Sequence, residues 1–527
     1  MHETMSSAAH SPRAGNDSHL MGSGLAWTLP SFRDLIFLAV FLSLTLGALA
    51  PRLFRDGGTG WHVRTGQIIL SSHAIPRIDP FSVSSTGKTW YAWEWLADVA
   101  MGATFQSAGL YGVSFLAALI IAATFAMLFT MLRQRHTGLF LSVVLVLLAI
   151  SGSTIHMFAR PHVASWLLML LWLRILESAR ETGRYRRLFW LPAVMLIWVN
   201  LHGGFLLGFV LLAIYWCDTK WVDSEDARLG HSNGERMLSY VTLASAFTSL
   251  INPFGYRIYT HIYQYLGDSF LMNHIQEFQS PNFHGAAERC FLALVLLAVL
   301  GIAVSQRTLT ARHLLILLFA IYAGVFASRN IPTSSMLIAL VIGPLLSSTL
   351  QRDRSQSTIP STLGRILTLQ DRVAQTDEKV RHGLWIAVGV ALLLCVTFRG
   401  GTLGPVRMAA QFEPARFPVE AVNFIQSQRI TDPVFSIDQW GGYLVFRLYP
   451  AKVMVDDRHD LYGAQFFQRY LDIVRVQPGW MQDLQSMNAQ LILVPSNSSL
   501  AGALESIPGW DVEYHDETAV LFRRSIN

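Results

Sequence analysis

The sequence is short of charged residues. Only 14% of its 527 residues are Asp, Glu, Lys or Arg, whereas soluble domains carry about 25%. Hydrophobic residues make up 52% of the chain, and the mean hydropathy is +0.37. Several apolar runs reach about 17–20 residues, the length that a helix needs to cross a bilayer. These features exclude an ordinary soluble protein and predict an α-helical multi-span membrane protein.

Cysteine is scarce, and the sequence has no large cluster of positive charge. The three cysteines, Cys217, Cys290 and Cys395, lie in or beside apolar runs, which indicates buried structural thiols and no disulfide framework. The net charge of +5 comes mainly from short loops, so nucleic acid is not an expected partner. Residues 1–30 are polar and lack the features of a cleaved signal peptide. We expect them to form a disordered cytoplasmic tail before a retained first span.

The apolar runs predict about 11 transmembrane helices within residues 31–398. Basic residues on one side of these runs outnumber those on the other by about two to one, which places the N-terminus in the cytoplasm. The first outer loop is then 53–109, and residues 399–527 lie outside. We therefore expect a multi-pass protein of a bacterial inner membrane with a periplasmic C-terminal domain. The expected spans cover residues 35–51, 110–132, 139–156, 163–176, 188–200, 205–217, 238–251, 290–304, 313–328, 331–350 and 384–398.

The tail, residues 399–527, predicts a small α/β domain. It contains short apolar runs bounded by polar or turn residues, which is the pattern of buried strands. Helical patterns fall between these runs, and such alternation is typical of a sheet covered by helices. The candidate strands are 433–437, 451–455, 491–494, 512–514 and 519–522.

The first outer loop concentrates acids and aromatic residues at a membrane surface. Asp56 follows the first span and lies among glycines, which let a backbone approach a ligand closely; the alternative is a flexible turn. Asp79 precedes a proline, and a turn start is the simpler interpretation of its role. Glu94 is either a second acid of the site or the cap of a short helix over 94–107. Asp56, Asp79 and Glu94 are the catalytic candidates.

Other polar residues gather at the predicted outer ends of spans. Ionisable residues inside a membrane are costly, so those that remain are functional candidates. Arg160 and Arg329 suit a phosphate or pyrophosphate, which a guanidinium binds with two parallel hydrogen bonds. The alternative is that each arginine extends to the interface without a ligand. The candidate phosphate-binding residues are Arg160, His162, His202 and Arg329.

Two stretches of the tail are candidates for binding an acceptor. Residues 440–443 predict a turn with an aromatic platform and exposed backbone donors. Asp456 and Asp457 follow the candidate strand 451–455, and open sheets place ligands at the carboxyl ends of strands. A structural turn and a solvated charge cluster are the alternatives. The acceptor candidates are Trp440, Gly441, Gly442, Tyr443, Asp456 and Asp457.

These motifs resemble those of bacterial membrane glycosyltransferases of the GT-C type. In the first outer loop the resemblance is carried by Asp56, Trp61-His62, Gly66, Ile75-Pro76, Asp79-Pro80-Phe81-Ser82, Gly87, Trp90 and Glu94-Trp95-Leu96. Further along the chain it is carried by Arg160-Pro161-His162, Trp198, Asn200, His202-Gly203 and Asn252-Pro253-Phe254-Gly255. The tail is similar in layout to the acceptor domain of oligosaccharyltransferase catalytic subunits, although the Trp-Trp-Asp-Tyr-Gly motif is replaced by Asp438-Gln-Trp-Gly-Gly-Tyr443.

The resemblance implies a GT-C-like transmembrane domain over 31–398 and transfer of sugars linked to polyprenyl phosphate or pyrophosphate on the outer face. Asp56 matches the acid that such proteins carry after the first span. Asp79 is the nearest match to a second acid that helps to bind a metal, so Asp56 and Asp79 are the candidate ligands of a divalent cation, magnesium or manganese. The implied partners are a polyprenyl-phosphate-linked sugar, membrane lipid, and an acceptor that is a glycan, a lipid or a protein.

We therefore expect an inverting glycosyltransferase, with hexosyl and oligosaccharyl transfer both open. Two other classes stay open at this point. A translocation component of an envelope polysaccharide or lipid pathway would use the same residues without chemistry. A non-catalytic assembly protein would bind its partner through the tail.

Overall fold

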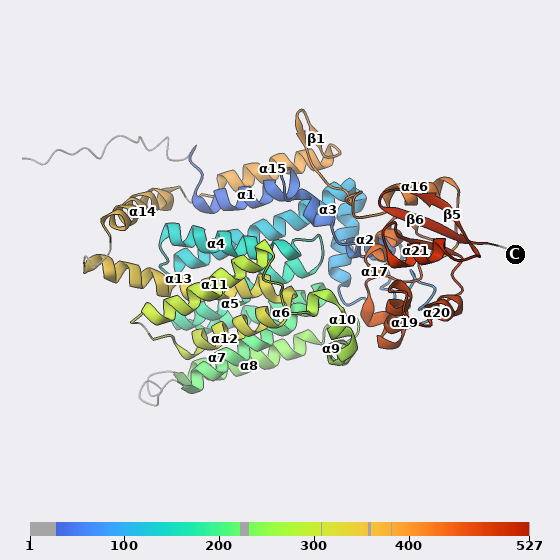
Figure 1. The fold of residues 1–527 in the computed structure, drawn as a ribbon. Helices are drawn as coiled ribbons and strands as arrows, with labels where there is room; N and C mark the ends of the chain where they lie inside the picture. The colour runs from blue at the N-terminus through green and yellow to red at the C-terminus, as the bar shows by residue number, and fades with distance from the viewer. Residues whose placement is uncertain (1–27, 222–230, 307, 357–359, 381, 526–527) are drawn as a thin grey trace, which may run out of the picture.

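The protein consists of a long bundle of helices and a small domain at one end of it (Figure 1). A computed structural model describes residues 28–221, 231–306, 308–356, 360–380 and 382–525. Most of the expected N-terminal tail, residues 1–27, lies outside the described residues. Bundle helices run roughly side by side, the C-terminal domain covers one end, and α14 (Ser361–Lys379) lies at the opposite end (Figure 1).

Each predicted span coincides with a helix. Apolar runs become helices in a bilayer because a helix satisfies its own backbone hydrogen bonds. The first of them also begins at a capping box formed by Ser31 and Asp34. The helices are α1 (Phe32–Thr45), α3 (Trp95–Gln134), α4 (Leu139–Ser153), α5 (His162–Thr182), α6 (Trp190–Leu201), α7 (Leu206–Trp221), α8 (His231–Ser249), α11 (Ala286–Val304), α12 (Ala311–Phe326), α13 (Ile331–Ser355) and α15 (Leu384–Phe398).

The helical membrane fold is confirmed, with several helices fit to cross a bilayer. Within the described residues, five helical segments are long and apolar enough on length and composition alone: 95–134, 139–156, 162–182, 286–304 and 328–355. The bent pair α14 and α15 adds a sixth if it forms one span, and 203–218 and 311–326 are apolar but shorter. The figure of about 11 spans stays a prediction, because helices such as α6 are shorter than a bilayer requires.

The expected first outer loop, residues 53–109, contains two helical segments. The loop contains α2 (Gly58–Ser72), which crosses the end of the bundle between the bundle and the tail domain (Figure 1). The expected helix over 94–107 is present as the first part of α3. It is separated from the membrane part by a kink at Ala108 and Gly109, where Gly109 takes a φ of +61° that favours glycine.

The tail is an α/β domain, as expected. Its sheet has the order β3-β4-β6-β5, in which β3 pairs parallel with β4 and the other neighbours are antiparallel. Four candidate strands are confirmed: β3 (Val434–Ser436), β4 (Leu491–Pro495), β5 (Trp510–His515) and β6 (Ala519–Arg524). A separate hairpin joins β1 (Thr402–Leu403) to β2 (Val406–Arg407). The tail helices are α16 (Val419–Ser427), α17 (Asp438–Leu448), α18 (His459–Tyr462), α19 (Ala464–Val474), α20 (Trp480–Ser486) and α21 (Ser499–Glu505).

The expected strand over 451–455 was wrong, and the segment has another role. Only Val453 forms bridges, one to Val434 of β3 and one to Ser82 of the first outer loop. The backbone N–H of Val453 donates to the carbonyl of Phe81 at 3.0 Å, and that of Val83 donates to the carbonyl of Val453 at 3.0 Å. The first outer loop is thus bonded to the edge of the tail sheet.

The tail is also fixed to the bundle by a close pair of helices. Glycines of α2 and its N-cap face glycines of α17, so the two backbones approach without side chains between them. A Cβ on Gly60 would lie 2.3 Å from the carbonyl oxygen of Gly442, and a Cβ on Gly442 would lie 2.4 Å from that of Gly57. Such spacing leaves no room for a methyl group, so the packing of α2 on α17 fixes the position of the tail relative to the bundle.

Candidate functional site

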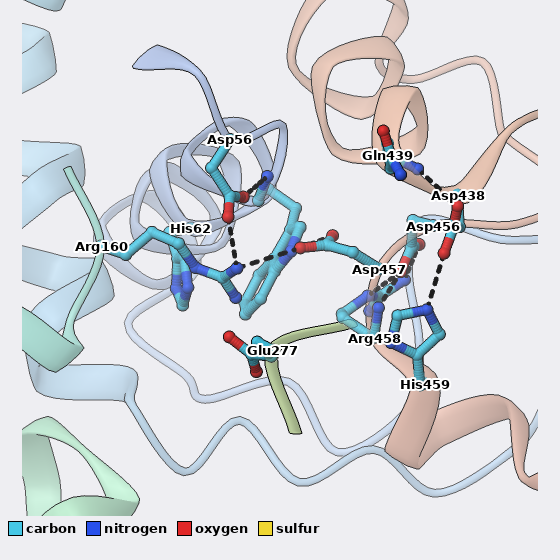
Figure 2. A network of polar contacts seen from close by, with 12 residues as sticks. Asp56, His62, Arg160, Glu277, Asp438, Gln439, Asp456, Asp457, Arg458 and His459 are labelled. Atoms are coloured by element: carbon cyan, nitrogen blue, oxygen red, sulfur yellow. Dashed lines mark hydrogen bonds and ion pairs between the residues drawn. The ribbon is translucent and has the colours of Figure 1, made fainter. Parts of the chain in front are cut away.

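Two acids and one arginine from three distant segments meet where the bundle and the tail join (Figure 2). Arg160 Nη1 lies 3.0 Å from Asp56 Oδ2 and 3.3 Å from Asp457 Oδ2. Asp56 precedes α2, Arg160 precedes α5, and Asp457 comes from the tail after Val455. The side chains of all three are about one quarter exposed or less. We call this group the arginine cluster.

Local structure explains why these three side chains converge. Asp56 Oδ1 accepts a hydrogen bond of 2.8 Å from the N–H of Gly58, in the first turn of α2. Asp457 Oδ1 accepts one of 2.9 Å from Trp61 Nε1. A Cβ on Gly58 would lie within 3 Å of Asp457 Oδ2, Arg160 Cζ and Asp56 Oδ1, so glycine leaves the space in which the charges meet.

The cluster is electrostatically unusual. Burial raises the pKa of Asp457 to about 7. Arg160 acts in the opposite direction, but repulsion from Asp56 and Asp456 offsets much of that attraction. Burial opposes the charge of Arg160, but Asp56 and Asp457 outweigh it and hold the arginine pKa above its ordinary value. Arg160 therefore stays cationic, and Asp457 exchanges a proton near neutral pH.

Asp79 and Asp456 belong to a different, fully buried group. Arg458 Nη1 donates to Asp79 Oδ1 at 2.8 Å, and Arg458 Nη2 donates to Asp456 Oδ2 at 2.6 Å. Asp79 also accepts hydrogen bonds from the N–H groups of Phe81 and Ser82, as a turn-starting aspartate does. The oxygens of both acids are occupied, so Arg458 joins the first outer loop to the tail and leaves neither acid facing a ligand.

Glu94, at the N-cap of α3, lies between two histidines. Its Oε2 is 3.6 Å from His62 Nε2, and its Oε1 is 3.5 Å from His202 Nε2. On the far side of His62, the Nδ1 atom lies 2.6 Å from Asp98 Oδ1. His62 and Asp98 are buried, and the side chain of Glu94 is only 11% exposed. The side chain of Glu94 makes no capping hydrogen bond to α3, and it has titratable neighbours on two sides.

Burial dominates the electrostatics of this second group. It raises the pKa of Glu94 to about 8, with Arg160 acting in the opposite direction. It also holds the pKa of His62 and of His202 well below the ordinary histidine value. At neutral pH both rings are therefore uncharged, and Glu94 holds a proton most of the time.

The remaining candidate phosphate-binding residues lie around the same end of the bundle. His202 and His162 are ring neighbours, with centroids 6.3 Å apart. Arg329 lies 3.2 Å from Glu277, which Figure 2 shows beside the arginine cluster. Burial would raise the pKa of Glu277, but Arg329 and other cations around it hold that pKa below its ordinary value. Arg160, His162, His202 and Arg329 thus belong to one electrostatic neighbourhood.

The expected turn at Trp440–Tyr443 was wrong. These residues are in the first turns of α17, and all four are buried. Trp440 Nε1 donates to the carbonyl of Arg416 at 2.7 Å, and the glycines contact α2 and the 455–456 backbone. The stretch therefore packs the tail and presents no aromatic platform. Among the acceptor candidates, Asp457 alone lies in the arginine cluster.

A metal site formed by Asp56 and Asp79 does not fit this arrangement. Asp56 is paired with Arg160, and Asp79 is paired with Arg458. Among the described residues, no group of three or more His, Cys, Asp or Glu side chains is arranged to hold a metal ion.

Four residues of the site were missed by the sequence analysis: His62, Asp98, Glu277 and Arg458. Asp98 follows Glu94 by four residues at the start of a helix, and residues at this spacing share a face. That spacing was a usable signal. Glu277 and Arg458 gave none, because their importance depends on contacts between segments far apart in the chain.

Comparison with solved structures identifies the fold. The apo crystal structure of the Archaeoglobus fulgidus oligosaccharyltransferase matches with a TM-score of 0.53 and 10% identity, over 88% of this chain and 69% of that one. The same enzyme tethered to an acceptor peptide with the NVT sequon matches with a TM-score of 0.49 and 12% identity, over 94% and 74%. ArnT from Cupriavidus metallidurans bound to undecaprenyl phosphate matches with a TM-score of 0.48 and 15% identity, over 93% and 97%.

The chain thus has a GT-C-like membrane fold, as its motifs predict. No protein-family model matches the sequence, and no curated protein matches it. At 10% identity the likeness to the oligosaccharyltransferase concerns the fold alone.

Proposed function

We propose that this protein is a membrane glycosyltransferase that moves a sugar from a polyprenyl-phosphate-linked donor to an acceptor on the outer face of the inner membrane. The observation that carries the proposal is the arginine cluster itself. The guanidinium of Arg160 and the carboxyl groups of Asp56 and Asp457 lie at one end of a helical bundle. The carboxyl group of Glu94, which contacts His202, lies at the same end. A glycosyl transfer with a phosphate leaving group needs a cation for the phosphate and a carboxylate for the nucleophile.

Arg160 binds the donor phosphate in this proposal. It lies beside the N-terminus of α2, where the helix dipole also favours an anion. Arg329 adds a second cation near the same region, and the rings of His162 and His202 lie around it. Because Asp56 and Asp457 occupy Arg160 in this structure, donor binding exchanges a carboxylate for a phosphate oxygen.

Asp56 orients the acceptor for its attack on the donor sugar. The acceptor group X–H attacks the anomeric carbon of the sugar, the X–C bond forms, and the C–O bond to the phosphate breaks. The bonding electrons leave with the phosphate oxygen, and the proton of X–H moves to a carboxylate of the site. Attack opposite to the leaving group inverts the anomeric configuration. Asp457 brings the tail into contact with this reaction, so the tail contributes to acceptor binding.

A transfer assay on the full-length protein tests this function. Proteoliposomes would receive a panel of polyprenyl monophosphate and pyrophosphate donors with radiolabelled sugars and an extract of envelope glycans, lipids and proteins. Asp56→Asn is expected to abolish transfer of label while the protein stays folded and inserted.

Asp511→Asn, a change at the exposed surface of β5, is the matched control and should keep wild-type transfer. Full transfer by the Asp56→Asn variant would remove Asp56 from the mechanism. Movement of labelled donor without any covalent product would favour a translocation component instead.

A further inference from the structure

Glu94 belongs to a row of buried titratable groups that also contains His62 and Asp98. Asp98 Oδ1 contacts His62 Nδ1 at 2.6 Å, and His62 Nε2 faces Glu94 Oε2 at 3.6 Å. His62 Nε2 and Asp98 Oδ2 are buried and have no hydrogen-bond partner within the described part of the chain. A buried polar atom without a partner calls for an explanation.

The contacts of His202 fix the position of its proton. Trp198 Nε1 donates to Ser165 Oγ at 2.7 Å, and Ser165 Oγ lies 2.9 Å from His202 Nδ1. The N–H of Gly204 donates to His202 Nδ1 at 2.9 Å. Because Nδ1 accepts this hydrogen bond, the neutral ring carries its proton on Nε2, which points at Glu94 Oε1.

His62 has no such constraint, and two arrangements of the same protons fit its contacts. In the first, His62 Nδ1–H donates to ionised Asp98, and protonated Glu94 faces His62 Nε2. In the second, protonated Asp98 donates to His62 Nδ1, and His62 Nε2–H faces ionised Glu94. The two arrangements differ by one proton shift at each end of the His62 ring. Negative charge therefore passes from Asp98 to Glu94, and the three side chains together keep the same number of protons.

We propose that Asp98 and His62 form a proton relay that converts Glu94 into a carboxylate, so that Glu94 takes the acceptor's proton during sugar transfer. Glu94 is the catalytic residue in this step, and His62 and Asp98 are positioning residues. The inference rests on the proposed function. Within that function, Asp56 orients the acceptor and Glu94 receives the acceptor's proton. His202 Nε2–H stabilises the Glu94 carboxylate, which is the form that the step requires.

The step balances without a co-reactant. Ionised Glu94 accepts the proton from the acceptor X–H as the X–C bond forms and the C–O bond to the phosphate breaks. Asp98 and Glu94 are then both protonated, and the three side chains together hold one proton more than before. The leaving phosphate, held by Arg160, or water takes that proton and restores the starting state.

Other charged groups act on Glu94 and enter any pH dependence. Their charges influence its protonation from the segment before α5, from α18, from the outer loop after α10 (Ser269–His274) and from the segment before α13. These groups are Arg160, Asp460, Glu277 and Arg329. His162 and Arg458 act on the adjoining histidines, and both stay unchanged in the variants below.

Nitrogen-15 NMR of the histidines tests the relay without any substrate. Full-length protein with labelled histidine would be studied in lipid nanodiscs, and a His62→Gln variant would identify the His62 signals. The wild type is expected to show both nitrogens of His62 partly protonated, as exchange between two arrangements requires. Glu94→Gln should leave the proton on Nδ1, since the amide group introduced by this substitution donates to Nε2. Asp98→Asn should leave it on Nε2.

Asp438→Asn is the matched control, because the Asp438–His459 pair at 2.9 Å has the same chemistry and no contact with Glu94. It should leave the His62 signals unchanged. A single wild-type tautomer that Glu94→Gln does not alter would overturn the relay.

Kinetic measurements distinguish a failure of the proton relay from a failure of the proposed function. Once transfer is measured, Asp98→Asn is expected to lower kcat by about 100-fold, to leave KM unchanged and to shift the pH profile. Transfer at the wild-type rate and pH profile in that variant would overturn the relay and leave the proposed function standing. The expected NMR pattern in a protein that transfers no sugar would contradict the proposed function alone.

Discussion

At the residue scale, the most consequential structural side chain is Arg458. Its guanidinium neutralises two carboxylates whose side chains are completely buried, and it lies 4.8 Å from the ring centre of Trp90. Removing one partner of a buried ion pair leaves uncompensated charge, which costs about 3–5 kcal/mol. Arg458 therefore holds Asp79 and Asp456 in place and, through them, the contact between the first outer loop and the tail.

Arg458→Met is expected to destabilise the protein by about 3–5 kcal/mol, because Asp79 and Asp456 then lack a buried counter-charge. The measurement is the melting temperature of detergent-solubilised protein. Arg523→Met is the matched control, since Arg523 pairs with Asp432 and Glu513 at a partly exposed surface and such pairs contribute about 1 kcal/mol or less. Equal losses in the two variants would contradict the structural role given to Arg458.

Asp457 predicts a dependence of stability on pH. Its ordinary pKa is 3.8, and burial raises the pKa in the folded protein to about 7. Between these values the folded state binds more protons than the unfolded chain, so the free energy of unfolding falls as pH rises from about 4 to about 7. Asp457→Asn removes this contribution. Relative to the wild type, the variant should gain stability between pH 5 and pH 8, by at most an amount on the order of 4 kcal/mol.

Melting curves of both proteins at the two pH values measure this difference. A gap between the wild type and the variant that stays constant with pH would show that Asp457 titrates normally.

Residue types at expected span ends were enough to find part of the site. Asp56 and Arg160 stood out because charge beside an apolar run is costly, and Glu94 stood out as an acid at the start of a short helix in the first outer loop. The partners of these residues were harder to find. The role of Asp457 depends on the docking of the tail, and the role of Asp79 as a buried partner of Arg458 depends on contacts 379 residues apart in sequence.

At the element scale, α2 and α17 decide how the tail is placed. Both helices present glycine at the contact, although glycine inside a helix costs about 1 kcal/mol relative to alanine. The distances explain that cost, because carbonyl oxygens occupy the positions where Cβ atoms would lie. Backbone contact along α2 then places Trp61 and Gly58 beside Asp457.

Gly442→Ala is expected to destabilise the protein by about 1–3 kcal/mol, because a methyl group at this position overlaps the backbone of Gly57 and forces α17 away from α2. It should also lower transfer, since Asp457 then moves away from Arg160. Melting temperature and the transfer assay measure the two effects.

Gly502→Ala in α21 is the matched control. Nothing lies within 4 Å of its Cβ position, so the better helix propensity of alanine should stabilise the protein by up to about 1 kcal/mol. If Gly442→Ala were also stabilising, the close packing of α2 on α17 would be refuted.

Apolar patterning predicted the bundle helices and four tail strands, because both depend on local periodicity. The same reasoning failed for Trp440–Tyr443. Paired glycines beside aromatic residues indicate a turn when read locally, but here the glycines are required by the approach of a second helix. The strand expected over 451–455 failed for a related reason, since Val453 pairs with a loop from the other domain.

At the scale of the whole molecule, the candidate site is incomplete without the tail. The bundle supplies Arg160, the first outer loop supplies Asp56 and Glu94, and the tail supplies Asp457. Sequence patterning separated a membrane part from a small α/β part, but it gave no information on their relative placement. That placement depends on glycine spacing and on buried charge, and neither leaves a periodic pattern.

The tail also contacts the membrane part at α9, and this contact should open independently of the one between α2 and α17. His261 Nε2 in α9 (Arg257–Gly267) lies 2.8 Å from Asp460 Oδ2 of the tail, and the His261 ring stacks on Tyr91 with centroids 4.5 Å apart. Asp460→Ala removes a charge-assisted hydrogen bond, which contributes about 1.5–3 kcal/mol. The glycine contact between α2 and α17 is left intact.

Hydrogen–deuterium exchange read by mass spectrometry separates the two contacts. In the Asp460→Ala variant, amide exchange of α9 is expected to rise about tenfold, whereas exchange of α17 should stay at the wild-type rate. Asp432→Ala, which removes a surface partner of Arg523, is the control and should change neither helix. A parallel rise in α9 and α17 would mean that the tail leaves the bundle as one body. In that case His261 and Asp460 would be essential to the assembled site, and α2 and α17 alone would not hold Asp457 against Arg160.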